Sequence, residues 1–160
     1  MTAPSPTVPM DLGVPGPVDI ESIPWVISKK AWGTTELKVL RASLRENCYT
    51  VRVRWSAGLA VPKHRHFGVV HAFTHSGKWH YKEYDWFATP GSYVAETPET
   101  EHSLVVDEDV EATFIVHGGQ VDVTEDGGTL GYMDAQRALA GYVALLGAQG
   151  LTLPTGIVDG

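Results

Sequence analysis

The sequence predicts an all-β domain of the sandwich or barrel type, closed by one helix near its carboxyl end. Apolar or alternating segments of strand length recur at intervals of roughly 8–12 residues, which is typical of such folds. Turn residues separate these segments, and the chain contains 17 glycines and 10 prolines. By contrast, residues 134–150 are rich in alanine and leucine and repeat their apolar positions at helical spacing. Asp134 suits the N-cap of this helix, and Gly147 or Gly150 suits its end.

The chain of 160 residues is long enough for one domain with its own core. Five of the ten prolines lie in residues 1–20, so we expect an amino-terminal arm there without a regular ladder or helix. We then expect the β-barrel over residues 21–133, the helix packed on the barrel over 134–150, and a tail over 151–160.

The clearest strand is the segment 49–55, because its residues alternate strictly in character. Its apolar set is Tyr49, Val51, Val53 and Trp55, and its polar set is Thr50, Arg52 and Arg54. Successive side chains of a strand point to opposite faces. We therefore expect the apolar set to face the core and the polar set to face water or a second subunit.

Two stretches between later strands predict turns. The tripeptide Ser76-Gly77-Lys78 separates two apolar segments and predicts a hairpin. The acidic stretch 107–111 separates the segments 102–106 and 112–116, and it predicts a solvated hairpin tip.

The composition is that of a globular protein and argues against nucleic acid as a partner. Hydrophobic residues make up 43% of the chain and charged residues 19%. The formal net charge of −7, with scattered basic residues, does not suit phosphate binding. The one cysteine, Cys48, excludes an intramolecular disulfide. Residues 1–14 do not form a secretory signal, and the apolar run 138–148 is about half a bilayer span. We expect a cytoplasmic protein without a membrane partner.

Three histidines form the strongest candidate for a functional site. His64 and His66 are two residues apart, so in a strand their imidazoles share a face at about 7 Å along the chain. His102 follows a proline-containing turn, and the intervening chain is long enough to return to the same interior. Imidazole binds zinc, iron, copper and nickel, and three imidazoles leave coordination positions open for a substrate. We therefore predict a metal site at His64, His66 and His102, although a single histidine is more often a surface or hydrogen-bonded core residue.

The other histidines are not predicted to bind this metal. His71 and His75 should face away from it if the strand is regular, whereas a β-bulge at Gly68 would reverse them. His80 and His117 are expected in polar or interface roles.

Glu96 is the candidate for a catalytic base. It precedes His102 by six residues, and from an inward-facing strand it would reach the metal or its bound water. Burial beside an apolar pocket would raise the pKa of its carboxyl group and suit it to proton transfer. The alternatives are a fourth metal ligand and a surface glutamate at a strand end.

Two segments resemble the conserved motifs of the cupin superfamily. Residues 62–77 resemble the first motif, and residues 90–102 resemble the second. The superfamily fold is a small double-sheet jelly-roll barrel with a metal in its interior, so the resemblance implies a cupin-type double-stranded β-helix. Val70 stands where cupins commonly have a glutamate, four residues after the second histidine. The resemblance therefore implies a three-histidine site without that carboxylate.

A narrower resemblance, over most of residues 24–153, is to the 2,4'-dihydroxyacetophenone dioxygenase family. It is carried by residues 64–66, 77–81, 85–86, 90–92 and 96–104 and by the final helix. Those enzymes use non-haem iron and O2 to cleave the carbon–carbon bond between the ketone and the adjacent hydroxymethyl carbon of an aryl hydroxyketone. The resemblance implies iron(II) as the cofactor, although imidazole also accepts zinc, nickel and copper. It implies an aryl ketone or a related dicarbonyl compound as the substrate, but Val69 is apolar where the family often has a polar side chain.

Two other functions stay open at this point. A cupin isomerase, cyclase or hydrolase would use the metal as a Lewis acid without oxygen. A non-catalytic sensor would resemble the cupins that form the effector half of some anti-sigma factors, but residues 1–20 are too short and proline-rich for the helical domain expected there. In each case we expect a homo-oligomer, a dimer or tetramer, with the arm and the Arg52 and Arg54 face as candidate contacts.

Overall fold

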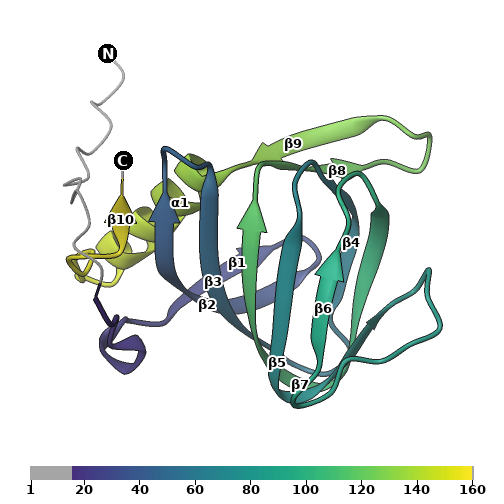
Figure 1. Cartoon of the computed structure of the whole chain (residues 1–160), viewed down its shortest axis with the longest axis horizontal. Coiled ribbons are helices and arrows are strands. Elements are labelled where there is room, and N and C mark those ends of the chain that lie inside the picture. The colour runs from purple at the N-terminus through teal and green to yellow at the C-terminus, as the bar shows by residue number, and fades with distance from the viewer. Residues whose placement is uncertain (1–15, 160) are drawn as a thin grey trace.

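The computed structural model describes residues 16–159, so most of the expected arm, residues 1–20, lies outside the described residues. Within this range the predicted all-β barrel with a carboxy-terminal helix is confirmed (Figure 1). In chain order the elements are the 3-10 helix η1 (Ile20–Ser22), the strands β1 (Val26–Lys30), β2 (Gly33–Ser43), β3 (Cys48–Trp55), β4 (Ala60–His66), β5 (Val70–Tyr81), β6 (Tyr93–Glu96), β7 (Glu101–His117), β8 (Gln120–Val123) and β9 (Thr129–Met133), the helix α1 (Ala135–Ala148) and the strand β10 (Val158–Asp159).

A mainly antiparallel sheet curls around an apolar interior. Its main path runs in the order β1-β2-β3-β7-β4-β8-β9, while β5 pairs with both β7 and β6. The alternation predicted for β3 is confirmed, because Tyr49, Val51, Val53 and Trp55 line the interior. The opposite face of β3 carries Arg52 and Arg54.

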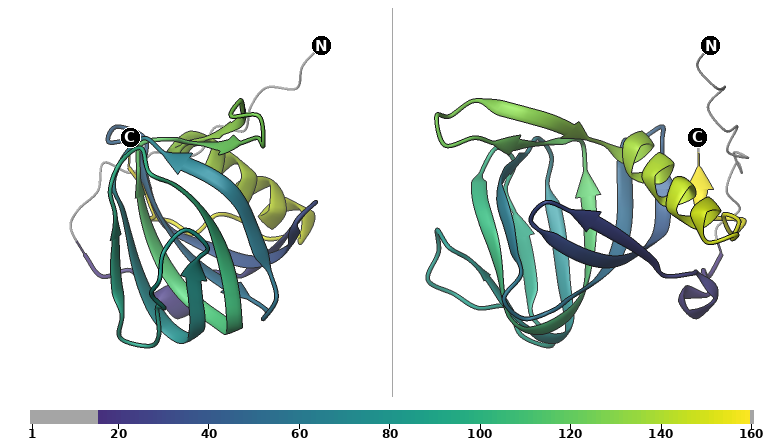
Figure 2. Two further views of the ribbon diagram at one scale, coloured as in Figure 1. Left: turned by 90° about the vertical axis from the view of Figure 1, so that its right-hand side faces the viewer. Right: turned by 180° about the vertical axis from the view of Figure 1, so that it is seen from behind.

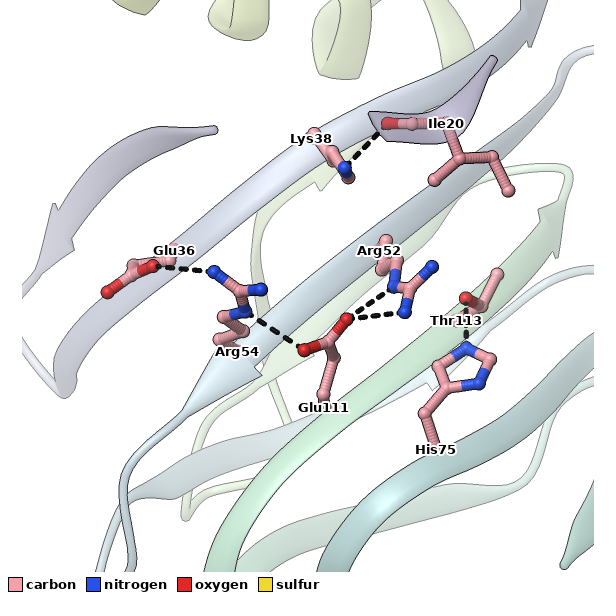
Figure 3. Close-up of polar contacts among 8 residues, drawn as sticks. All are labelled: Ile20, Glu36, Lys38, Arg52, Arg54, His75, Glu111 and Thr113. Atoms are coloured by element: carbon pink, nitrogen blue, oxygen red, sulfur yellow. Dashed lines mark hydrogen bonds and ion pairs between the residues drawn. The ribbon is translucent and has the colours of Figure 1, made fainter. Parts of the chain in front are cut away.

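The outer face of β2, β3 and β7 carries a network of paired charges (Figure 3). Glu111 accepts hydrogen bonds from Nε of Arg52 at 2.6 Å and from Nε of Arg54 at 3.0 Å. Arg54 also lies 3.8 Å from the carboxylate of Glu36. These groups satisfy one another within the chain, and a homo-oligomer formed through this face stays a prediction.

The two predicted turns are wrong, because residues 76–78 and 107–111 lie inside the long strands β5 and β7. These strands stay paired through both stretches, and the register of their ladder shifts on both sides of Ser76. Gly77 has a φ of 79°, and a Cβ there would lie only 2.0 Å from the carbonyl oxygen of Asp109. Only glycine allows this conformation and this close approach. The glycine therefore marks a bulged bend that the two strands make together.

Helix α1 begins and ends near the predicted residues. The side chain of Asp134 accepts a hydrogen bond from the backbone N–H of Arg137 at 2.8 Å, which makes it the N-cap. Gly150, with a φ of 70°, follows the last turn. The buried side chains of the helix are Ala135, Leu139, Tyr142 and Leu146. They belong to the face that packs on β1, β2 and β3, and Figure 2 shows the helix against that side of the barrel. Among residues 16–159, no helix is long and apolar enough to cross a membrane.

Both ends of the described chain are fastened to this framework. Near the amino terminus, the hydroxyl of Tyr142 donates to the carbonyl of Pro24 at 2.6 Å, and Nζ of the buried Lys38 donates to the carbonyl of Ile20 at 2.6 Å (Figure 3). At the other end, the expected tail of residues 151–160 contains β10, which pairs in parallel with β2. Burial of the adjacent Ile157 and Val158 side chains explains why this segment is held against the sheet.

Candidate metal centre

The three predicted histidines come together inside the barrel. Strands β4 and β7 are antiparallel neighbours, and their register places His64 directly opposite His102. Alternation along β4 brings His66 to the same face as His64. The exposed fractions of His64, His66 and His102 are 7%, 5% and 1%. One nitrogen from each lies within 4.8 Å of the other two, so these residues could hold one metal ion.

Hydrogen bonding leaves this set with lone pairs for a cation. Nδ1 of His64 lies 2.8 Å from the carbonyl oxygen of Pro62. Because a carbonyl only accepts, Nδ1 carries the proton and Nε2 keeps its lone pair. Nδ1 of His66, Nε2 of His102 and Oε2 of Glu96 are buried without a hydrogen-bond partner within residues 16–159. Buried polar atoms are rarely left unpaired, and a cation beside Nε2 of His102 and Oε2 of Glu96 would give both of these atoms a partner.

Burial keeps two of the imidazoles neutral. Removal from water lowers the pKa of His64 and lowers the pKa of His66 to about 4. Neutral imidazole is the form that binds a metal. At neutral pH, neither side chain has to release a proton before it binds.

Glu96 lies beside two of the three histidines. Its strand, β6, pairs with β5 so that Glu96 stands directly opposite Val70. The neighbouring strand therefore supplies a carboxylate beside the position where Val70 lacks one. Oε2 of Glu96 lies 3.2 Å from Nε2 of His102 and 3.5 Å from Nε2 of His66. Among the described residues, the group whose ligand atoms lie within 4.8 Å of one another consists of the three histidines. Glu96 lies next to this group and is not a member of it.

The predicted rise in the pKa of Glu96 is wrong. Burial does raise this pKa, but the contact with His102, the nearby His66 and the hydroxyl of Tyr81 together outweigh burial and hold it below its usual value. The group is therefore a carboxylate at neutral pH. The neighbours responsible lie on β4, β5 and β7, and their approach to Glu96 is a tertiary effect that spacing along the chain does not reveal.

Tyr81 is a member of the site that its sequence context does not distinguish from barrel core. Its hydroxyl donates to Oε1 of Glu96, and its ring stacks on His102 with centroids 3.9 Å apart. Burial, followed by the charge of Glu96, raises the pKa of Tyr81 well above its usual value, so the hydroxyl stays protonated. Tyr81 thus orients both Glu96 and His102. Its inward parity is the only sequence feature that could have suggested this role, and buried core aromatics share it.

The remaining histidines lie outside the centre. His71 and His75 project from the outer face of β5, where Nε2 of His75 lies 2.7 Å from Oγ1 of Thr113 (Figure 3). This is the orientation expected for a strand without a bulge at its start. His80 and His117 contact other polar groups away from the centre.

Two cavities reach the centre from different sides. An interior cavity of about 270 Å³ extends from His64, His66 and Glu96 through the barrel to helix α1. Its apolar walls include Val51, Val53, Val70, Leu104, Phe114, Val116 and Leu145. A separate cleft of about 500 Å³ reaches Glu96 and His102 from the outer side, and its walls include Tyr84, Trp86 and Phe87. Apolar walls with a few convergent polar groups are typical of sites for small organic molecules.

The barrel and its buried histidine cluster define this protein as a cupin. More specifically, residues 16–122 match the ChrR cupin-like domain, and the chain belongs to that family. No curated protein matches the sequence.

Solved structures share the whole fold at low identity. An RmlC-like cupin protein from Ralstonia eutropha JMP134 has 24% identity and a TM-score of 0.81, over 87% of this chain and 91% of that one. A second cupin-like protein of unknown function from the same organism has 27% identity and a TM-score of 0.77, over 89% and 90%. An acetylacetone dioxygenase from Acinetobacter johnsonii has 17% identity and a TM-score of 0.77, over 86% and 97%. At 17% identity the likeness to the dioxygenase establishes the fold alone.

Proposed function

We propose that this cupin is a non-haem iron(II)-dependent dioxygenase that cleaves a carbon–carbon bond of an aryl hydroxyketone, similar to 2,4'-dihydroxyacetophenone, or of a related dicarbonyl compound. The observation that carries the proposal is a buried set of three imidazoles at the end of an apolar interior cavity. Three histidine ligands leave coordination positions for both a substrate and oxygen. The sequence resemblance to 2,4'-dihydroxyacetophenone dioxygenases and the fold shared with an acetylacetone dioxygenase support this choice among cupin activities.

In this proposal His64, His66 and His102 hold the iron. Bound iron(II) would supply chelation of two substrate oxygens and reaction with O2. The interior cavity contributes orientation, because its apolar walls can hold an aryl ring while the oxygens of the ketone face the histidines. The same walls exclude water from the reacting end of the substrate.

Glu96 is the proposed proton acceptor. The hydroxyl of Tyr81 occupies Oε1, whereas Oε2 faces His66 and His102 and has no hydrogen-bond partner within the described chain. A hydroxyketone must lose a proton to become electron-rich enough to react with oxygen, and in this proposal Oε2 accepts that proton. Tyr81 acts through Glu96 and His102, and it is therefore a positioning residue.

Oxygen uptake tests the proposal directly. Protein loaded with iron(II) should consume one O2 per molecule of 2,4'-dihydroxyacetophenone and form the aryl carboxylic acid and formic acid, which together account for every atom of the ketone and of O2. Metal-free protein should consume none. The measurement is an oxygen-electrode trace together with chromatography of the two acids. Absence of uptake across a panel of aryl hydroxyketones and dicarbonyl compounds would contradict the proposal.

The same assay separates the alternatives. Turnover of a carbonyl substrate under anaerobic conditions, supported equally by zinc, would assign a Lewis-acid isomerase, cyclase or hydrolase. Metal and ligand binding without turnover under either condition would assign a sensor.

A further inference from the structure

One of the tyrosines that line the interior cavity has a hydroxyl that is not needed for packing. Tyr49 on β3 lines the cavity and is only 7% exposed. Its hydroxyl makes no hydrogen bond within residues 16–159, whereas the hydroxyls of its neighbours Tyr81 and Tyr142 are both engaged. The hydroxyl is not among the fully buried unpaired atoms of the described residues, so it is open to the cavity that Tyr49 lines. Phenylalanine would fill the same volume. The hydroxyl is therefore available to something that enters the cavity.

The position of Tyr49 relative to the metal centre follows from the register of the sheet. Tyr49 on β3 pairs with Val116 on β7, Val116 pairs with Val70 on β5, and Val70 pairs with Glu96 on β6. All four residues line the interior cavity. Neighbouring strands are about 4.8 Å apart, so this row spans at most about 14 Å of curved sheet. It forms a wall with polar groups at its two ends and two valines between them.

The end of the cavity at Tyr49 lies near charged groups. The pKa of Tyr49 is raised first by burial and then by the charge of Asp134, so the phenol stays protonated and can donate. Asp134 is paired with Nη1 of Arg137 at 3.0 Å, and Arg137 also lines the cavity. Lys30 also lines the cavity, but it pairs with Gly33 at the start of β2, whereas Tyr49 pairs with Ala42 near the end of that strand. This end therefore offers a neutral donor and a guanidinium group, a combination that suits an oxygen atom of a ligand.

The cavity volume limits the size of such a ligand. A cavity of roughly 150 Å³ holds benzene, and this one measures about 270 Å³. It can therefore hold one aromatic ring with short substituents at two opposite ends. A ring lying along Val70 and Val116 would direct one substituent to the histidines and the other to Tyr49.

We propose that Tyr49 is a specificity-determining residue, whose hydroxyl donates a hydrogen bond to an oxygen substituent at the end of the aromatic ring remote from the metal-chelating oxygens. In the substrate proposed above, 2,4'-dihydroxyacetophenone, this oxygen is the 4'-hydroxyl. This inference rests on the proposed function to identify which end of the ligand chelates the metal. The existence of the Tyr49 subsite does not depend on that function.

The test compares two probes that differ by one hydroxyl. They are 2-hydroxyacetophenone and 2,4'-dihydroxyacetophenone, which share the hydroxyketone end. Binding to the full chain loaded with iron(II) is measured without oxygen by calorimetry, and kcat/KM is measured with oxygen. The wild-type protein should bind the 4'-hydroxy compound more tightly by about fivefold, the value of one hydrogen bond. Tyr49→Phe should abolish this preference and leave the affinity for 2-hydroxyacetophenone unchanged.

A matched control comes from the same cavity. Tyr142 also lines it, but its hydroxyl is bound to the carbonyl of Pro24. Tyr142→Phe should therefore keep the preference and lower the Tm by about 3 °C, because a partly buried carbonyl loses its donor. Tyr49→Phe should not lower the Tm, since its hydroxyl has no partner to lose. If Tyr49 had a purely structural role, Tyr49→Phe would lower the Tm and would leave the preference for the 4'-hydroxy compound unchanged.

The outcomes separate this inference from the proposed function. Equal affinity of the wild-type protein for both probes, or a preference that survives Tyr49→Phe, would overturn the Tyr49 subsite even if oxygen is consumed. A preference that depends on Tyr49 without any oxygen uptake would support the subsite and overturn the dioxygenase. A preference lost in Tyr84→Phe, in the outer cleft, and not in Tyr49→Phe would place the ligand outside the barrel and overturn the inference.

Discussion

At the scale of single residues, the centre depends on the contacts that hold each side chain in its orientation. The backbone carbonyl of Pro62 fixes the tautomer of His64. The ring of Tyr81 stacks on the ring of His102, and its hydroxyl binds Oε1 of Glu96, which leaves Oε2 free. Such contacts orient metal-binding groups. The spacing of His64 and His66 predicts their common face, since it follows from strand geometry alone. The contacts of Glu96 could not be predicted in the same way, because they join four different strands.

Replacing Glu96 by glutamine tests its assignment as the proton acceptor. Glu96→Gln keeps the shape of the side chain but removes the charge and the basic oxygen. Turnover should fall by at least about 100-fold, whereas the iron content should match that of the wild-type protein. Glu99→Gln, on the exposed loop that follows, serves as the control and should leave both quantities unchanged.

Loss of iron from Glu96→Gln would instead identify Glu96 as a fourth ligand. A variant with unchanged iron content and unchanged turnover would remove Glu96 from the mechanism.

At the scale of elements, the long strands β5 and β7 determine how the barrel closes. Glycine and acidic residues are typical of turns, so Gly77 and residues 107–111 predict two hairpins. The two strands are in fact paired through this region, and Gly77 permits the close contact of their bend. A bend shared by two strands cannot be distinguished from two turns without knowing which strands are partners.

The outer face of the same sheet gives a prediction about pH and stability. Burial raises the pKa of Glu111, but its hydrogen bonds and ion pairs with Arg54 and Arg52 outweigh this and lower it. A carboxyl group whose pKa is lower in the folded state stabilises the protein above its unfolded pKa, and this stabilisation disappears as the pH falls through the folded pKa. Glu111→Gln should therefore lower the free energy of unfolding by about 1 kcal/mol at pH 7. The difference from the wild-type protein should shrink towards zero as the pH is lowered below about 4.

Urea unfolding of metal-free protein at a series of pH values measures this difference. Glu36→Gln is the control, because Glu36 pairs with Arg54 at 3.8 Å on an exposed part of the same face and should matter little. A deficit in Glu111→Gln that is the same at pH 7 and pH 3 would show that the ion pairs are not its source.

At the scale of the whole molecule, the barrel brings three distant stretches of chain to one interior point. They are the stretches that contain His64 and His66, Tyr81, and Glu96 with His102. The strand spacing and the terminal helix predict this architecture, since amphipathic strands of this number must close on a shared core. The enclosed cavity and the row from Glu96 to Tyr49 could not be predicted, because they depend on the order of strands in the sheet. The position of Tyr49 on an inward face is predicted, yet its unpaired hydroxyl becomes evident only when every neighbour is known.

The central claim is that His64, His66 and His102 form one metal site, and anaerobic titration with iron(II) tests it most directly. The wild-type protein should bind one ion per chain. At an iron concentration 100 times the Kd, its free energy of unfolding should rise by about 2.7 kcal/mol, or its Tm by roughly 5–10 °C. His102→Gln should lose both the binding and the shift, whereas His75→Ala, on the outer face, should keep them. Equal stoichiometry and an equal shift in His102→Gln, or no binding by the wild-type protein, would contradict the account.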